Sequence, residues 1–433
     1  YNLYYNEATA VQNTGKELPP ATYTNYRFGT LFINNPEAIG GVVLSDDAFI
    51  YNLNVSAGSF FDLNGKKLSV YGTSFTNSGK IDASHQDATI AFIGISNISM
   101  TGSMAANYSN NYVSNLIVDN NAIVYYNSAL QIGSPTISGV LTLKSGVFYH
   151  YSQNLHIYGN VATTNGTMTK TGGELRFLGS VGNVGTINFT NQTATITTLE
   201  MNETGVNPQV TLNGNLTINT NFILTSGIVN MGSYLVYYSS YTNETPMLPA
   251  SQNSSSYFKF NGASSGLKWY MYNKTAGKIY QWPIGPTGIS GWRPITLELT
   301  SNSSSALVTF GYNDPMAGTA YSASDIVDAG NIRSNYIANL TLQGSLGANA
   351  PNITMEYQNS DFNVAPTTGN VQIWYYGTNP TSCWTTTGAQ DANGTNGANT
   401  TITKNSALLL NTAGTYPLNL AEVNNCLLYT SPS

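Results

Sequence analysis

Short stretches with an apolar residue at every second position recur along the first half of the chain. Their apolar pairs run, in order, Leu53/Val55 with Leu68/Val70, Leu116/Val118 with Leu130/Ile132, Leu141/Leu143 with Leu155/Ile157, and a looser copy at Phe222/Leu224 with Leu235/Val236. The first apolar residues of the two stretches are 15, 14, 14 and 13 residues apart in these four copies. A period of two is the period of a β-strand, and glycines and polar residues that close such stretches are typical of turns. The pattern predicts many short strands.

The strand-and-turn pattern is nearly continuous from residue 41 to 241. Turn signals punctuate it at Asn64-Gly65, Ser78-Gly79, Asn165-Gly166 and Asn213-Gly214, and no helical period intervenes. One such unit cannot bury its apolar face, whereas stacked units can. We therefore predict a parallel β-solenoid over 41–241 with a repeat of roughly 20 residues. A string of small β-sandwiches is the alternative, but one sandwich needs about 100 residues.

The segments on either side of this region have different compositions. Residues 1–40 are irregular, and Leu18-Pro19-Pro20 does not suit a central strand because proline lacks the N–H that a ladder needs. We expect an extended N-terminal arm that caps the first coil or, alternatively, pairs with a neighbouring molecule. Residues 242–256 form a polar linker. All five tryptophans follow it, so we predict one or two β-sandwich domains over 257–425.

Composition narrows the classes of protein. Only 8% of the 433 residues are charged, against roughly 25% in a typical soluble protein. Amides, hydroxyls and 30 tyrosines supply the polar surface instead, so little helix is expected. The 15 lysines and arginines form no basic patch and the net charge is −6, so nucleic-acid binding is not expected. No apolar run is long enough for a membrane-spanning helix.

The ends of the chain carry their own signals. The first residue is Tyr1, which indicates a removed leader or a fragment. The last eight residues, Cys426–Ser433, resemble the translation of a transposon adapter used in shotgun library preparation, so we interpret 426–433 as an artefactual tail and expect the natural sequence to be cut near Asn425. Cys383 is then the one natural cysteine of the chain, although an ordinary polar tail with a Cys383–Cys426 disulfide is the alternative.

Several motifs resemble one family of secreted proteins. The string Tyr51–Gly72 resembles the repeats of large surface proteins that Bacteroidota secrete through the gliding-associated (type IX) route. Downstream, three segments are similar to conserved motifs of that group, namely Gln281-Trp-Pro-Ile-Gly285 with Trp292-Arg-Pro-Ile-Thr-Leu297, Val371-Gln-Ile-Trp-Tyr-Tyr-Gly377 with Trp384, and Thr415-Tyr-Pro-Leu-Asn-Leu-Ala-Glu422. The resemblance covers about 41–425 and implies an adhesin or extracellular structural protein. The C-terminal sorting domain of the family is absent, and the matched residues carry no catalytic role.

Candidate chemistry is sparse. The loop Asp391–Gly397 places oxygen side chains at alternate positions, so Asp391, Asn393 and Thr395 are a calcium candidate, although the bidentate acid of a calcium loop is missing and a plain loop is the simpler interpretation. No other cofactor is predicted. His150 and His156 share parity in a strand pattern, and we interpret them as a pair of surface imidazoles. Gly262-Ala-Ser-Ser-Gly266 matches G-x-S-x-G, but a strand follows it, so we interpret it as a turn.

Acidic and aromatic residues could also serve a polysaccharide. The acids near the predicted coils are Asp46, Asp47, Asp62, Asp82 and Asp87, and they do not fall on equivalent positions of the repeat, so solvated turns explain them. The aromatic residues in or beside the coils are Tyr125, Tyr126, Phe148, Tyr149, Tyr151, Tyr237 and Tyr238. An outward row of rings would suit a sugar or a protein partner, but ladders that stabilise neighbouring coils are the simpler interpretation.

These observations lead to one hypothesis about function. We predict an extracellular or cell-surface protein with a structural or adhesive role, possessing no enzyme activity and perhaps forming the subunit of a filament by self-assembly with identical copies. Glycans and host or cell surfaces are further candidate partners. The alternatives are a polysaccharide-binding or polysaccharide-degrading β-helix protein and a phage tail-fibre-like spike.

Overall fold

The computed structural model describes most of the chain as strands in two compact units, Tyr1–Val229 and Asn230–Ser433. The described residues are 2–6, 10–15, 17–18, 29–102, 112–239, 256–262, 264–286, 291–303, 305–313, 337–362, 366, 371–377, 383–386, 392–396, 399–405 and 414–422. Strands account for 64% of the chain, and the first unit is a parallel β-solenoid of about 10 turns. The predicted all-β class is therefore confirmed. Among the described residues no helix has the length and apolar character that crossing a membrane requires.

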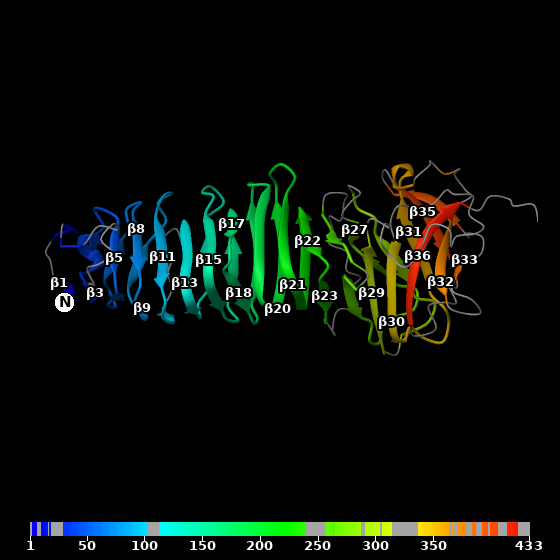
Figure 1. Ribbon diagram of the computed structural model, residues 1–433, viewed down its shortest axis with the longest axis horizontal. Coiled ribbons are helices and arrows are strands. Elements are labelled where there is room, and N and C mark those ends of the chain that lie inside the picture. The colour runs from blue at the N-terminus through cyan, green and yellow to red at the C-terminus, as the bar shows by residue number, and fades with distance from the viewer. Residues whose placement is uncertain are drawn as a thin grey trace, which may run out of the picture. The chain divides into compact units, whose positions relative to one another are not determined.

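Each coil of the first unit has three faces, and equivalent strands of successive coils pair in parallel (Figure 1). The first face contains β5 (Ala48–Ile50), β8 (Lys67–Val70), β11 (Thr89–Gly94), the first halves of β13 (Asn115–Tyr126) and β15 (Val140–His150), and β17 (Asn160–Thr163). The second face contains β1 (Leu3–Asn6), β3 (Thr30–Asn34), β6 (Asn52–Val55), β9 (Ser74–Asn77), β12 (Ile98–Thr101), the second halves of β13 and β15, and β18 (Thr167–Lys170).

The third face closes the coil. It contains β2 (Gln12–Asn13), β4 (Val42–Val43), β7 (Phe60–Asp62), β10 (Lys80–Asp82), β14 (Leu130–Ile132), β16 (Leu155–Ile157) and β19 (Glu174–Gly179). In the last coils the corners straighten, so that β20 (Asn183–Glu203) and β21 (Gln209–Ser226) each run through all three faces with shifts of register between them. The sequence predicted two strands in each of these segments, and the structure joins them.

Registered apolar residues fill the interior of the solenoid. On the first face Leu68, Ile90, Leu116, Leu141 and Val161 lie one above another, and all are at most 4% exposed. Their positions in the sequence show that a coil has 20 to 26 residues there. Stacking of this kind removes each apolar face from water, at a gain of about 25 cal/mol per Å² buried. The neighbouring coil thus completes the core of each coil.

The step of 13 to 15 residues seen in the sequence is not the repeat of the structure. Leu53 pairs with Leu31 and Phe75 on the second face, whereas Leu68 belongs to the first face. The two stretches of the motif therefore lie on different faces rather than stacking on each other. The alternation of apolar residues identified the strands correctly, but the distance between neighbouring strands along one coil was mistaken for the distance between coils.

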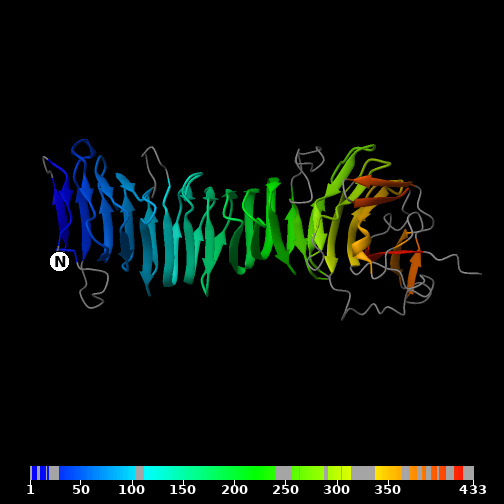
Figure 2. The same cartoon turned by 90° about the horizontal axis from the view of Figure 1, so that it is seen from above.

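The N-terminal region contributes strands to the first coils. β1 pairs in parallel with β3, and β2 pairs with β4, so parts of 1–40 already belong to the parallel ladder (Figure 2). A 3-10 turn, η1 (Glu37–Ile39), separates β3 from β4. Tyr4 stacks on Phe32 across the β1–β3 pair, with ring centroids 4.4 Å apart. Pro19 and Pro20 lie outside the described residues.

The second unit begins with parallel pairs and continues as two antiparallel sheets. Its first sheet contains β23 (Leu235–Tyr238), β24 (Phe258–Phe260), β25 (Gly266–Tyr270), β27 (Ile284–Pro286), β29 (Ser305–Asn313), β30 (Ile337–Ser345), β36 (Gly414–Glu422), β32 (Val371–Gly377) and β33 (Cys383–Thr386). Its second sheet contains β26 (Ile279–Trp282), β28 (Ile295–Glu298), β31 (Asn352–Tyr357), β35 (Asn399–Lys404) and β34 (Ala392–Asn396). The remaining strand, β22, spans Ile228–Gly232, and a 3-10 turn, η3, spans Asn359–Asp361.

Buried tryptophans join the two sheets of the second unit. Trp269 of the first sheet meets Trp282 of the second with ring centroids 5.1 Å apart, and Phe310 lies against Trp282 on the other side at 4.9 Å. The indole N–H of Trp282 donates to the carbonyl oxygen of Leu267, 3.0 Å away. Large aromatic side chains between two sheets are the core that the sequence predicted for this region. Most of the predicted linker, 242–255, lies outside the described residues.

Candidate functional site

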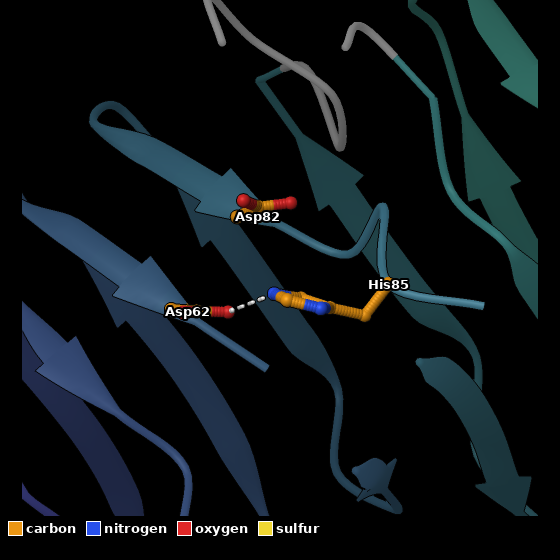
Figure 3. A group of neighbouring side chains, drawn as sticks. All are labelled: Asp62, Asp82 and His85. Atoms are coloured by element: carbon orange, nitrogen blue, oxygen red, sulfur yellow. Dashed lines mark ion pairs between the residues drawn. The ribbon is translucent and has the colours of Figure 1, made fainter. Parts of the chain in front are cut away.

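Two aspartates occupy the same position in successive coils of the third face. Asp62 is the last residue of β7 and Asp82 the last residue of β10, and the two are register partners in the parallel pair (Figure 3). Each carboxylate accepts hydrogen bonds from the turn that follows its strand. Asp62 accepts from the Asn64 N–H at 2.7 Å, and Asp82 accepts from the Ser84 N–H at 2.9 Å and the Ser84 hydroxyl at 2.6 Å. The expectation that these acids do not share a repeat position is wrong for this pair.

His85 brings an imidazole to the same place. Its Nε2 lies 3.6 Å from an oxygen of Asp62, and one ligand atom each from Asp62, Asp82 and His85 lie within 4.8 Å of one another (Figure 3). The turn below makes room, because Asn64 and Gly65 both adopt positive φ, 48° and 72°, and a Cβ at Gly65 would meet that of His85 at 3.9 Å. Three side chains from two coils thus converge at one corner of the solenoid.

The electrostatics of this corner follow from its burial. Burial raises the pKa of the Asp62 carboxyl, and the neighbouring Asp82 carboxylate raises it further, while the Asn64 N–H and His85 oppose the rise. The Asp82 residue is only 9% exposed, whereas half of the His85 side chain is accessible. Two carboxylates in adjacent strands repel each other unless a proton or a cation lies between them. The corner is therefore a place where positive charge is favoured.

The calcium candidate receives no such geometry. Asn393 and Thr395 lie in β34, which pairs with β35 as a hairpin, and Asn393 is the register partner of Ile402. Asp391 lies outside the described residues. These residues were expected to form a loop, and the structure instead places Asn393 and Thr395 in a strand. Calcium binding there stays a prediction.

The two histidines expected as a surface pair have separate environments. His150 is fully buried, packs against Tyr126 and Phe148, and has its Nε2 3.2 Å from the Ser128 carbonyl oxygen. Burial, reinforced by the neighbouring Lys170, lowers the pKa of His150 to about 3, so the ring is neutral at pH 7. The interpretation as two surface imidazoles is therefore wrong for His150, because an inward position of the second face took a polar ring.

His156 belongs to a half-buried ionic cluster on the third face. Its Nε2 lies 3.2 Å from a carboxylate oxygen of Glu174, which also accepts two hydrogen bonds from Arg176, at 2.7 and 2.9 Å. Arg176 reaches the next coil through Glu200, at 2.8 Å. Arg176 and His156 lower the pKa of Glu174, while Glu174 raises the pKa of Arg176. The charges in this cluster are mutually satisfied, which is typical of a structural network.

Aromatic rings stack along the outside of the coils. Tyr125 meets Tyr149 with centroids 5.6 Å apart, and Tyr151 lies 4.6 Å from Tyr149. Another stack joins Phe49 and Tyr71 at 4.5 Å. Each of these side chains is half-buried, and rings in one coil cover rings in the next. The ladder interpretation made from the sequence therefore describes how these aromatics pack.

The segment that matches G-x-S-x-G is a turn that leads into a strand. Ser265 N–H donates to the Gly262 carbonyl oxygen at 3.1 Å, and β25 begins at Gly266. A nucleophile elbow needs a helix at that point. The turn interpretation is confirmed, and Ala263 lies outside the described residues.

Comparisons with known proteins give no relative. No family model, no curated protein and no solved structure matches the chain. The site must therefore be interpreted from its own residues.

The corner formed by Asp62, Asp82 and His85 was missed because the repeat length was misjudged. Phe60-Phe61-Asp62-Leu63-Asn64 and Lys80-Ile81-Asp82-Ala83-Ser84 share the order apolar, aspartate, apolar, polar, and they are 20 residues apart. Twenty residues is one coil in this part of the solenoid. A comparison of segments at that distance would have identified the pair, but the position of His85 depends on the turn that follows Asp82.

Proposed function

We propose that this protein is an extracellular structural or adhesive surface protein in which the solenoid of the first unit serves as a shaft. The observation that carries the proposal is the in-register stack of coils, whose apolar columns are buried and whose backbone ladders connect each coil to the next. Contacts in such a stack lie between neighbours, so length can be added without changing the design. The sequence resemblance to secreted surface proteins of Bacteroidota points the same way.

The surface chemistry of the chain supports this proposal. The solenoid presents amides, hydroxyls and tyrosine ladders rather than charges, which make up only 8% of the residues. Stacked aromatic rings contribute about 0.5–1.5 kcal/mol per pair beyond the area they bury. A shaft of this kind gains its cohesion from contacts that salt does not screen. We extend the proposal to self-assembly and to glycan or cell-surface partners.

Labelling of intact cells tests the location. Antibodies raised against the protein are applied to cells of the source organism before and after permeabilisation. We expect full labelling of intact cells, because the proposal places the protein outside the membrane. Labelling that requires permeabilisation would contradict it.

Pulling single molecules tests the shaft. With handles on the two ends of the chain, we expect the first unit to extend in steps of one coil or a few coils, each coil releasing about 70–90 Å of chain at roughly 3.4 Å per residue. Force spectroscopy measures these step lengths directly. A single step that releases the whole unit at once would show that the coils do not act as separable neighbours.

A polysaccharide-degrading role is the second candidate, and one observation favours it. Asp62 and Asp82 form a pair of neighbouring carboxylates, which is the residue type that glycosidases use. Incubation with a panel of polysaccharides would reveal new reducing ends if the pair were catalytic. Asp82→Asn should then abolish their release, whereas an unchanged panel removes this candidate.

A further inference from the structure

We propose that Asp62, Asp82 and His85 bind a divalent transition-metal ion, and that zinc is the ion their chemistry favours. Each residue offers one ligand atom, and the three atoms lie within 4.8 Å of one another (Figure 3). Carboxylate oxygens together with an imidazole nitrogen are a zinc ligand set. Calcium and magnesium take oxygen ligands, so the nitrogen of His85 selects against them.

The distances suit an ion of this size. Zinc bonds of about 2.0–2.1 Å in a tetrahedral arrangement place neighbouring ligand atoms about 3.4 Å apart. His85 Nε2 and the nearer oxygen of Asp62 already lie 3.6 Å apart. Asp62 and Asp82 are register partners, and neighbouring strands lie about 4.8 Å apart, so a small side-chain rotation brings the second carboxylate to the same distance. Water would take the fourth position.

The charges and the burial of the corner supply an independent argument for a cation. Asp82 is 9% exposed and lies beside Asp62, and the ion pairs of the described residues give Asp62 no cationic partner except His85. The other charges that face Asp62 are those of Asp82 and His85 themselves. A dication between the carboxylates removes their repulsion, while a neutral imidazole remains free to coordinate it.

The ligands come from two successive coils, and this gives the ion a structural consequence. Asp62 belongs to the coil of β7, whereas Asp82 and His85 belong to the coil of β10 and the turn that follows it. An ion held by all three would join these coils at a corner of the third face. The inference is independent of the proposed function, since such a clamp suits any protein built on this solenoid.

Titration calorimetry of the untagged full chain with zinc chloride at pH 7.5 tests the proposal. We expect one zinc per chain, and we expect His85→Ala and Asp82→Asn each to weaken binding at least tenfold. Two matched controls keep wild-type affinity. His156→Ala removes the other histidine that lies beside a carboxylate, and Asp87→Asn removes an exposed acid close by in the sequence. Cobalt in place of zinc should give the visible absorption of a tetrahedral site in the wild type and lose it in His85→Ala.

Three results would overturn the proposal. They are the absence of zinc binding, binding that His85→Ala leaves unchanged, and binding of calcium in preference to zinc. The side chain of His85 is half accessible, so its replacement tests the site even if Asp82→Asn fails to fold. Circular dichroism of each variant confirms that the fold is retained.

Discussion

Replacing Arg293 with methionine is expected to lower the free energy of unfolding of the second unit by about 3–5 kcal/mol. The Arg293 guanidinium is 1% exposed and donates to both carboxylate oxygens of Asp361, at 2.5 and 2.7 Å, and to the Trp292 carbonyl oxygen at 2.8 Å. Asp361 is fully buried and also accepts from the Gln358 N–H at 2.9 Å. The variant therefore leaves a carboxylate in the core without its countercharge.

Tryptophan fluorescence during urea unfolding measures this effect selectively, because all five tryptophans belong to the second unit. The double variant Arg293→Met with Asp361→Leu should recover most of the loss, since apolar residues replace a buried ion pair at little cost. As a control, Lys268→Met removes a partly exposed cation that lies over the Tyr237 ring and should change stability by less than about 1 kcal/mol. An unchanged midpoint in Arg293→Met would show that the pair does not hold the sheets together.

Glu203→Gln is expected to make the protein more stable at alkaline pH by about 3 kcal/mol and to leave it unchanged at pH 4. Glu203 is fully buried at the end of β20, where one carboxyl oxygen accepts from the Val181 N–H at 3.2 Å and the other has no partner among the described residues. Burial raises the pKa of this carboxyl from 4.5 to about 7.

The sign of the pH dependence follows from this shift. Below pH 4.5 the carboxyl is protonated in both the folded and the unfolded chain, so it adds no pH dependence. Between pH 4.5 and 7 the unfolded chain releases the proton and the folded chain keeps it, so stability falls as the pH rises. Urea unfolding of the wild type and of Glu203→Gln from pH 4 to 8 measures the difference, with Asp87→Asn as an exposed control. A constant difference across this range would contradict the buried, protonated carboxyl.

The alternation of apolar residues predicted strands well because each strand buries one side in a continuous core. Leu68/Val70 and Leu141/Leu143 show this directly, since all four side chains are fully buried. Tryptophan placement likewise predicted the sandwich, because Trp269 and Trp282 fill the space between two sheets. Period and composition together therefore defined the class of fold.

The interior polar residues and the site depended on information that the local pattern lacks. Lys170 follows His150 on the next coil, and its ammonium donates to the carbonyl oxygens of Tyr151, Gln153 and Gly172, so a charged side chain occupies an inward position. Only the path of the corner makes those carbonyls available. Asp62 and Asp82 meet for the same reason, because the length of a coil decides which residues stack.

Distances between spin labels along one face test the central claim, which is that successive coils stack in register. Lys67, Thr89, Asn115, Val140 and Asn160 are consecutive register partners. With coils about 4.8 Å apart, labels at Lys67 and Asn160 should lie roughly 19 Å apart, and labels at Thr89 and Asn160 about 5 Å closer. Pulsed electron paramagnetic resonance measures both distances. A separation that does not shorten by one strand spacing when the label moves one coil would contradict the stacked solenoid.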